Sequence, residues 1–316
     1  MSRPAEPHVL KSCGFPRLNN LHGILLLILL LPYGEAAAAH KFAHCRPLPA
    51  DAAFPSDFPA LQDQEWGYRL GGWGGLAKGR PVRRHPVIFI HGNTRDASDW
   101  DEPGHSVKKR FLDAGYSPQE LWAVSYNGKS TKGLSAAHLC QTDNRTNIPD
   151  LAAFVKAVLA YTGAQKVDLI AHSLGVTIAR GMLAQHPELA RIVEHFVAIA
   201  GPNHGTTVCR RLWLVWIIGW RDHMGCDELV PGSAWLQSLN GLNAEQEAPG
   251  PTRVLTVYDG TGADIFYLPW LFGWPVRDQD SPALKGAQNV KMPGLTHDEL
   301  RTSDDAVSAY LRFVKQ

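Results

Sequence analysis

Residues 167–175, which read VDLIAHSLG, decide the fold of this 316-residue chain. The apolar start of the stretch is typical of a β-strand, and the turn that follows has alanine two places before Ser173 and glycine two places after it. Small residues there let a strand and the next helix approach closely, while the serine, in a strained backbone conformation, exposes its Oγ above the sheet edge. Such a match arises about 0.3 times by chance in a chain of this composition. The assignment of Ser173 as a nucleophile therefore depends on the residues before and after this motif.

Strands and helices are predicted to alternate on both sides of this turn. We expect strands at 86–90, 121–126, 166–171, 195–200, 253–257 and 290–292, and helices over about 149–163, 174–186 and 304–314. Continuous apolar runs such as Pro86–Ile90 are typical of central strands covered on both faces. Strands that alternate with helices favour a mostly parallel, doubly wound sheet with right-handed crossovers. The sequence therefore predicts a single α/β domain over residues 87–316.

The first 39 residues have the pattern of a secretory signal peptide. Three basic residues precede the unbroken apolar run Ile24–Leu31, and the small residues Ala36–Ala39 follow it. A membrane anchor is the alternative, but this eight-residue run falls far short of the roughly 20 residues that span a bilayer. We expect cleavage near Ala38 or Ala39. Residues 40–86 are predicted to form an irregular extension, because Ala43–Trp73 is rich in Pro, Gly and Asp.

The composition and net charge of the chain indicate which classes of molecule it can bind. The chain is 45% hydrophobic and 19% charged, as in ordinary globular proteins, and its formal net charge is +1. Without residues 1–39 it is near neutral, so nothing indicates nucleic acid or an anionic surface as a partner. The four cysteines that remain predict two disulfides; of the three possible pairings, proximity favours Cys209–Cys226 with Cys45–Cys140. Their spacing fits no zinc motif, and we expect no metal site.

A base and an acid are predicted to accompany the serine. An acyl-transfer serine needs a base, a carboxylate that orients it and donors for the developing oxyanion, and in a doubly wound sheet these groups follow the carboxyl ends of strands. His297 follows the last predicted strand and precedes the last helix, so it is the predicted base. The loop after strand 253–257 offers Asp264 and Asp259. We favour Asp264 as the acid, because Asp259 stands beside a glycine and fits a turn former.

The predicted oxyanion donors are two backbone N–H groups. One belongs to Leu174, directly after the serine, and the other to Asn93, in the loop after the first core strand. Gly92 would let that loop turn toward the site. His172, inside the turn that holds the serine, is expected to be a packing residue.

Six short motifs carry a resemblance to a known family. They are Ile88–Asn93, Ala171–Gly175, Gly201–Gly205, Pro231–Ser233, Gly262–Asp264 and Leu295–His297. Together they resemble the α/β-hydrolase fold and, within it, secreted bacterial lipases of the class 2 type and extracellular polyhydroxybutyrate depolymerases. The resemblance covers Val87 to the C-terminus and implies Ser173 as nucleophile, Asp264 and His297 as its partners, and no cofactor. Ala171 departs from the commoner Gly-x-Ser-x-Gly, but alanine is usual there in the small lipases that this chain looks like.

Two apolar segments rich in tryptophan lie near the predicted site. Residues 212–220 and 265–274 hold five of the ten tryptophans of the chain. Exposed segments of this kind would suit a lipid or polyester interface, whereas a buried cap helix or core is the alternative. The candidate contact residues are Trp213, Trp216, Trp220, Trp270 and Trp274.

Three hypotheses about function follow from these observations. The leading one is a secreted serine carboxylic-ester hydrolase that acts on acylglycerols. A close alternative is an extracellular polyhydroxyalkanoate depolymerase, which uses the same chemistry on a solid polymer. The third is a non-catalytic binding protein on a hydrolase scaffold. The expected partner is thus an ester lipid or a polyester, and the oligomeric state is not predicted.

Overall fold

The computed structural model describes most of the chain after residue 80. The described residues are 53–59, 70–76, 81–93, 95–126, 144–211, 227–241, 247, 250–271 and 273–316. All of them belong to the unit His40–Gln316. The predicted signal peptide, residues 1–39, lies outside the described residues and stays a prediction.

Seven strands form one sheet in the order β1-β3-β2-β4-β5-β6-β9. The strands are β1 (Gly71–Gly74), β2 (Val87–Ile90), β3 (Leu121–Ser125), β4 (Val167–His172), β5 (Val193–Ile199), β6 (Arg253–Tyr258) and β9 (Gln288–Lys291). β1 pairs with β3 in antiparallel fashion, and every other neighbouring pair is parallel. The predicted mostly parallel sheet is confirmed, and each of its six predicted strands is present with small shifts at the ends.

β1 was not predicted, since it lies within the segment expected to be irregular. Its sequence, GGWG, has little intrinsic preference for a strand. The glycines are required because the β1 backbone lies very close to β3. A Cβ at Gly72 would lie 2.1 Å from the carbonyl oxygen of Ala123, and a Cβ at Gly74 would lie 2.3 Å from the ring of Trp122. Tertiary packing, which the local pattern does not report, therefore determines this strand.

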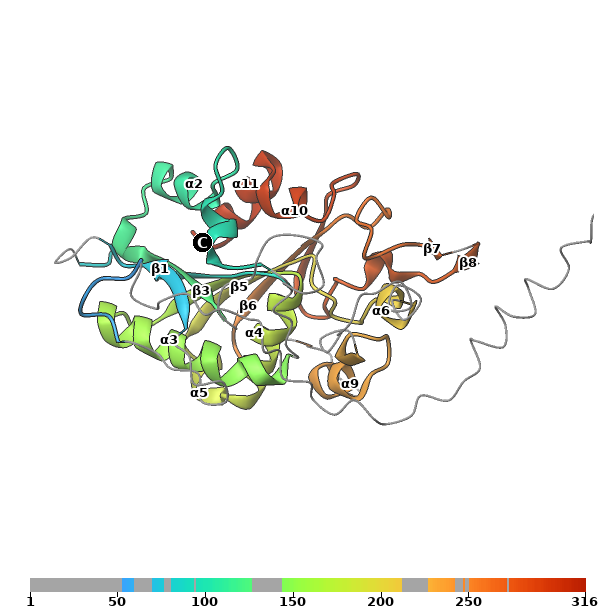
Figure 1. Ribbon diagram of the computed structural model, residues 1–316, viewed down its shortest axis with the longest axis horizontal. Helices are drawn as coiled ribbons and strands as arrows, with labels where there is room; N and C mark the ends of the chain where they lie inside the picture. Colours follow the sequence, from blue (N-terminus) through green and yellow to red (C-terminus); the bar gives the residue numbers. More distant parts are fainter. Residues whose placement is uncertain are drawn as a thin grey trace, which may run out of the picture. The chain divides into compact units, whose positions relative to one another are not determined.

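Helices cover both faces of the sheet (Figure 1). They are α2 (Val107–Asp113), α3 (Ile148–Thr162), α4 (Leu174–Gln185), α5 (Pro187–Ala190), α6 (Thr207–Arg211), α9 (Ala234–Asn240), α10 (Glu299–Thr302) and α11 (Asp304–Phe313), with short 3-10 turns η1 (Ala97–Asp101), η2 (Pro118–Glu120), η4 (Arg145–Asn147) and η5 (Asp278–Asp280). In the view of Figure 1, α2, α10 and α11 lie above the sheet, and α3, α4 and α5 lie below it. A separate two-stranded hairpin, β7 (Trp270–Leu271) with β8 (Trp274–Pro275), follows β6. This hairpin was not predicted either.

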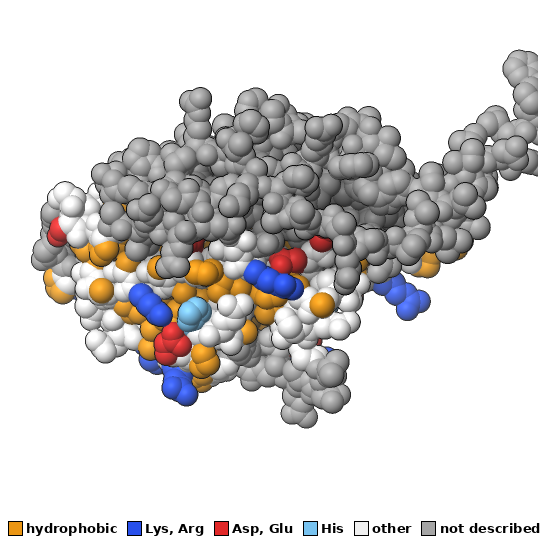
Figure 2. Space-filling view, turned by 60° about the horizontal axis from the view of Figure 1, so that its bottom comes forward, with side chains coloured by type: hydrophobic (Ala, Val, Ile, Leu, Met, Phe, Trp, Pro, Cys, Tyr) orange, Lys and Arg blue, Asp and Glu red, His pale blue; other side chains and the backbone are white. Residues whose placement is uncertain are grey.

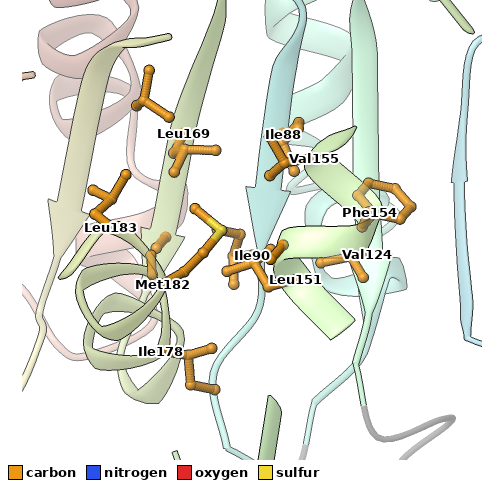
Figure 3. Packing of buried hydrophobic residues seen from close by; sticks show 14 of the residues in the cluster. Ile88, Ile90, Val124, Leu151, Phe154, Val155, Leu169, Ile178, Met182 and Leu183 are labelled. Atoms are coloured by element: carbon orange, nitrogen blue, oxygen red, sulfur yellow. The ribbon is translucent and has the colours of Figure 1, made fainter. Parts of the chain in front are cut away.

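Two apolar cores, one on each face, hold the helices to the sheet. Because side chains alternate along a strand, Ile88 and Ile90 of β2 belong to one core and Val87 and Phe89 to the other. Figure 3 shows the first core, where side chains of α3 and α4 pack on β2, β3 and β4. All four of these β2 residues have no exposed surface. This double coverage explains why β2 reads as an unbroken apolar run.

Charges of both signs are interspersed on the face that Figure 2 shows. In the described part of that face, basic side chains lie close to acidic ones, and no broad patch of one sign is seen. The near-neutral composition is thus also locally balanced there. Among the described residues, the chain has no helix with the length and apolarity needed to cross a bilayer.

Candidate active site

Ser173 occupies the sharp turn between β4 and α4. Its backbone angles are φ 55° and ψ −125°, in a region that costs a non-glycine residue on the order of 1–3 kcal/mol. The Ser173 N–H donates to the Ile199 carbonyl at 2.9 Å and so ties the turn to β5. Ala171 is fully buried, and a Cβ at Gly175 would lie 2.4 Å from the carbonyl oxygen of His91. Packing therefore requires small residues on both sides of the serine, as the sequence predicted.

His297 and Asp264 are in direct contact beside this turn. His297 Nδ1 lies 2.7 Å from Asp264 Oδ2. Because a carboxylate only accepts hydrogen bonds, the imidazole donates from Nδ1, and the lone pair of Nε2 is left to take a proton. Asp264 is buried, and its Oδ1 accepts the Phe266 N–H at 3.0 Å. The His297 side chain is 15% exposed, and the rings of His172 and Phe266 each lie 4.6 Å from its ring.

Asp259, the alternative acid, has a different set of contacts. Its carboxylate accepts hydrogen bonds from the N–H groups of Thr261, Gly262 and Ala263, from the Thr261 hydroxyl, and from the Gly294 N–H. Burial by itself raises the pKa of Asp259, but these hydrogen bonds outweigh that effect and lower the pKa to about 2. Asp259 therefore braces the loop that leads to Asp264 and the loop that leads to His297, while Asp264 is the residue that contacts the histidine.

The two predicted oxyanion donors flank the serine. Leu174 is the first residue of α4, so its N–H is one of the helix-start donors that have no partner within the helix. On the other side, Gly92 packs against the serine, because a Cβ built on it would lie 3.0 Å from the Ser173 Cβ. Asn93 follows in an exposed turn. The geometry agrees with an oxyanion site between these two backbone groups, and the roles of Leu174 and Asn93 stay predictions.

His91 orients the peptide that carries the Asn93 N–H. Its Nδ1 lies 2.7 Å from the Gly92 carbonyl oxygen, and in a trans peptide the N–H points opposite to the carbonyl. The His91 ring stacks on Tyr126 with centroids 3.9 Å apart, and the Tyr126 hydroxyl donates to the His91 carbonyl at 2.8 Å. Burial lowers the pKa of His91 to about 4, so the ring is neutral at ordinary pH. The sequence marked this loop but not the part that its histidine plays.

An ion pair and a hydrogen bond tie the segment that follows Asn93 to the segment that follows His297. Arg95, two residues after Asn93, pairs with Asp298, directly after His297, with 3.1 Å between Nη2 and Oδ2. Deeper in the molecule, the fully buried Arg301 of α10 donates to the Asp99 carbonyl of η1. Sequence reasoning missed both ties, since their partners are about 200 residues apart.

One group of side chains in the described residues has donor atoms that could surround a metal ion, and it lies at the opposite edge of the sheet. His85, Asp168 and His195 offer ligand atoms that lie within 4.8 Å of one another. His195 Nδ1 lies 2.9 Å from Asp168 Oδ1, and Arg253 Nη1 lies 3.1 Å from His195 Nε2. An arginine always donates, so the ring proton is on Nδ1 and faces Asp168. This arrangement favours a hydrogen-bonded network over a metal site.

The structure describes part of the tryptophan-rich segments. Trp213, Trp216 and Trp220 lie outside the described residues. Trp270 and Trp274, on the β7–β8 hairpin, are 61% and 65% exposed, so for this segment the exposed alternative holds. Of the cysteines, Cys45, Cys140 and Cys226 lie outside the described residues. Cys209 is disulfide-bonded, and the predicted pairing stays a prediction.

Sequence comparison identifies lipases among the relatives of the chain. A family model described as Lipase (class 2) matches residues 84–262, more than half of the chain. The triacylglycerol lipase of Pseudomonas fragi is 29% identical over 164 residues, which cover 50% of this chain and 48% of that protein. The lysosomal acid lipase/cholesteryl ester hydrolase of Macaca fascicularis is 25% identical over 181 residues, covering 49% of this chain and 41% of that protein. The chain thus matches less than half of the length of either relative.

Solved structures show the same fold. Bacillus licheniformis lipase BlEst2 in its mature form has a TM-score of 0.57 at 17% identity, over 78% of this chain and 97% of that one. Aspergillus fumigatus lipase B has a TM-score of 0.51 at 14% identity, over 74% and 53%. At these identities the likeness concerns the fold, which is that of the α/β-hydrolases, as the sequence predicted.

Proposed function

The chain belongs to the class 2 lipase family, and from that premise we propose that it is a serine hydrolase of carboxylic esters with acylglycerols as its substrates. The observation that carries the proposal is the 2.7 Å contact between Asp264 and His297 beside the turn that holds Ser173. This support is independent of the family match, which ends at residue 262 and includes neither the acid nor the base.

The proposed mechanism proceeds through an acyl-enzyme. His297 Nε2 takes the proton of the Ser173 hydroxyl as Oγ attacks the ester carbonyl carbon, and the N–H groups of Asn93 and Leu174 hold the resulting oxyanion. When the oxyanion collapses, the carbon–oxygen bond to the alcohol breaks and His297 returns the proton to the leaving alcohol. Water, deprotonated by His297, then attacks the acyl carbon; the bond from that carbon to Ser173 Oγ breaks, His297 returns the proton to Oγ, and the acid is released. Asp264 holds the imidazole in one tautomer and stabilises its cation.

Four exposed apolar side chains in the segment that directly follows Asp264 support a lipid substrate. They are Ile265, Phe266, Trp270 and Trp274, with exposed fractions of 67%, 39%, 61% and 65%, and together they are called the apolar patch. These are four of the five exposed large hydrophobic residues in the described part of the chain; Leu76, at 54%, is the other. Exposed apolar residues scattered along a chain need no explanation, but four of them within residues 265–274, directly after Asp264, are typical of an interaction surface. We infer that this patch rests on the lipid surface that presents the ester.

The substrate class and the patch can be tested together. We expect the protein to hydrolyse both a soluble short p-nitrophenyl ester and a triolein emulsion. Removing both tryptophans, as Trp270→Ala with Trp274→Ala, should lower the rate on triolein by about 10-fold or more relative to the rate on the soluble ester, because each exposed side chain contributes about 1–2 kcal/mol of apolar transfer. Leu76→Ala is the matched control and should change neither rate. An unchanged ratio of the two rates in the double variant would remove the patch from substrate binding.

The same assay can also show whether the substrate is a polyester instead of an acylglycerol. Turnover of amorphous polyhydroxybutyrate granules, with none of triolein, would replace acylglycerols by a polyester as the substrate. If the protein hydrolyses neither these substrates nor the soluble ester and is not modified by a fluorophosphonate, a non-catalytic binding function would be the better interpretation.

We also propose that the protein is exported. The support is the basic, apolar and alanine-rich order of residues 1–39, together with a disulfide at Cys209, since disulfides persist in oxidising compartments. Sequencing the N-terminus of the mature protein tests this: export with cleavage predicts a start at or just after Ala38 or Ala39, and an intact N-terminus in the cytosol would contradict it.

A further inference from the structure

We propose that His172 is a positioning residue that fixes the main chain of the base His297 next to the nucleophile. This inference rests on the proposed function, because it gives His172 a part in the same site. His172 Nε2 lies 3.0 Å from the carbonyl oxygen of His297, and a carbonyl only accepts, so the imidazole donates this hydrogen bond. The two rings also lie against each other, with centroids 4.6 Å apart. The residue directly before the serine thus holds the residue that takes the proton of the serine.

The tautomer of His172 is determined by its surroundings. The side chain is buried, and its Nδ1 has no hydrogen-bond partner among the described residues. Gly92 covers this atom, since a Cβ built there would lie 3.4 Å from Nδ1. A protonated Nδ1 would leave a buried donor without an acceptor, which costs about 1–3 kcal/mol. The single proton of the ring therefore belongs on Nε2, where the His297 carbonyl accepts it.

A neutral His172 suits a neighbour that becomes a cation. Burial lowers the pKa of the His172 imidazole well below its usual range, and the nearby His297 and Arg301 lower it further. When His297 takes the proton of the serine, a charged His172 at this distance would oppose it, whereas a neutral ring does not. The hydrogen bond can therefore hold the base without disfavouring the charged state that the reaction needs.

The loop that carries His297 is exposed, so each hydrogen bond or ion pair that holds its main chain matters for the position of the base. All residues from Pro293 to Glu299 are exposed or half-buried. Two of the other ties described above attach to this loop, where they hold Gly294 through Asp259 and Asp298 through Arg95. The hydrogen bond from His172 reaches His297 itself, and it comes from the residue adjacent to Ser173. A shift of about 1 Å between a nucleophile and its base can lower a rate about 100-fold, so this link bears directly on catalysis.

Two variants of His172 separate the hydrogen bond from the packing of the ring. His172→Phe keeps an aromatic ring and removes the donor, whereas His172→Gln puts an amide N–H near the position of Nε2. With a soluble short ester we expect kcat to fall about 10- to 100-fold in His172→Phe with KM unchanged, and to recover most of that loss in His172→Gln. The acid limb of the kcat/KM profile should stay in place, because a neutral ring is replaced by a neutral ring. Circular dichroism and thermal unfolding check that both variants fold.

Three results would overturn the inference. The first is a wild-type kcat in a folded His172→Phe protein, and the second is an equal loss in both variants, which would assign the effect to packing. The third needs no variant: in ¹⁵N spectra of the intact protein, His172 must be neutral and protonated at Nε2 near neutral pH, and a cation or the Nδ1–H tautomer would contradict the geometry. Failure of the proposed function is distinct, because the wild-type protein would then hydrolyse no ester at all.

Discussion

The parallel strands of the central sheet have an aspartate in contact with a histidine at both ends. We call the side where the strands end the carboxyl edge and the side where they begin the amino edge. The two pairs differ in what surrounds them. At the carboxyl edge, His297 Nδ1 lies 2.7 Å from Asp264, and at the amino edge, His195 Nδ1 lies 2.9 Å from Asp168. The difference is at the other ring nitrogen. Arg253 donates to Nε2 of His195, which occupies the lone pair that a base needs. A short contact between aspartate and histidine is therefore not sufficient evidence of a reactive site.

The two aspartate–histidine pairs also differ in their position along the strands of the sheet. Asp264 and His297 follow β6 and β9 and meet the turn that holds Ser173 after β4. Asp168 lies near the start of β4, at the opposite end of the strand from the serine. Loops that follow the carboxyl ends of parallel strands converge on one edge, where backbone donors and side chains can surround a substrate. The same pair of residue types thus braces the fold at one edge and, in our account, orients a base at the other.

Replacing the acid should have the largest effect. Asp264→Asn presents an amide to His297 Nδ1 and favours the wrong tautomer of the imidazole, so we expect kcat to fall about 10⁴-fold with KM little changed. Steady-state kinetics on a soluble ester measure this. A rate near that of the wild-type protein would exclude Asp264 as the acid and leave Asp259 as the candidate.

A smaller loss of rate is expected from Asp259→Asn. The variant places an amide where five hydrogen bonds converge on a carboxylate, so the acid and base loops should loosen and kcat should fall about 10- to 100-fold. Stability should fall by about 2–3 kcal/mol at neutral pH. Because folding lowers the pKa of Asp259 to about 2, its contribution is fully present above the unfolded pKa of about 4 and is lost as pH falls toward about 2.

Urea unfolding of the wild-type and Asp259→Asn proteins at a series of acidic pH values tests that contribution. The wild-type protein should lose more stability than the variant between about pH 4 and about pH 2. Parallel loss in the two proteins would show that the ionised carboxylate of Asp259 does not stabilise the folded protein.

The amino edge should respond in stability and not in rate. Asp168→Asn should leave kcat on a soluble ester unchanged, while the free energy of unfolding falls by about 1–3 kcal/mol, since the carboxylate accepts from the ring and the main-chain N–H of His195. A large loss of kcat in a folded Asp168→Asn protein would contradict the division between the two edges.

The effect of Asp168→Asn on the free energy of unfolding should also depend on pH, because His85 lies beside Asp168. The Asp168 carboxylate, whose Oδ1 lies 3.6 Å from His85 Nδ1, raises the pKa of His85, so this contribution is present below the unfolded pKa of about 6.5 and is lost as pH rises through the folded pKa. The stability gap between the wild-type and Asp168→Asn proteins should therefore be wider at about pH 5.5 than at about pH 8. A gap independent of pH would indicate that His85 does not pair with Asp168 in solution.

Most of the sheet could be predicted, because the strands β2 to β6 are almost fully buried and read as apolar runs. β1 could not be, since GGWG becomes a strand only where Trp122 and Ala123 require glycine beside them. The β7–β8 hairpin was also missed, because its tryptophans suggested an interface or a core and gave no strand period. The local pattern of apolar residues predicts strands whose own side chains form the core. Strands such as β1 depend instead on close packing against residues far away in the sequence.

The sequence predicted that Ser173, Asp264 and His297 follow strand ends in this order, and the structure places them so, with Asp264 against His297. Their catalytic roles stay predictions. The contacts that hold these residues in place could not be predicted. His172 was expected to be a packing residue, and it is buried, but its partner His297 lies 125 residues further along the chain. Asp259 was interpreted as a turn former, which agrees with its bonds to residues 261–263; its bond to Gly294 needs the register of two separate loops. Such contacts depend on tertiary geometry, which a single sequence does not specify.

Trapping the nucleophile tests the central claim most directly. The intact protein would be incubated with a fluorophosphonate, and the modified peptide identified by mass spectrometry, alongside the Asp264→Asn and Asp168→Asn variants. We predict one phosphonyl group on Ser173, rapid labelling in the wild-type and Asp168→Asn proteins, and labelling slowed by orders of magnitude in Asp264→Asn. An unmodified Ser173 in the folded wild-type protein, or equal labelling rates in the two variants, would contradict the account.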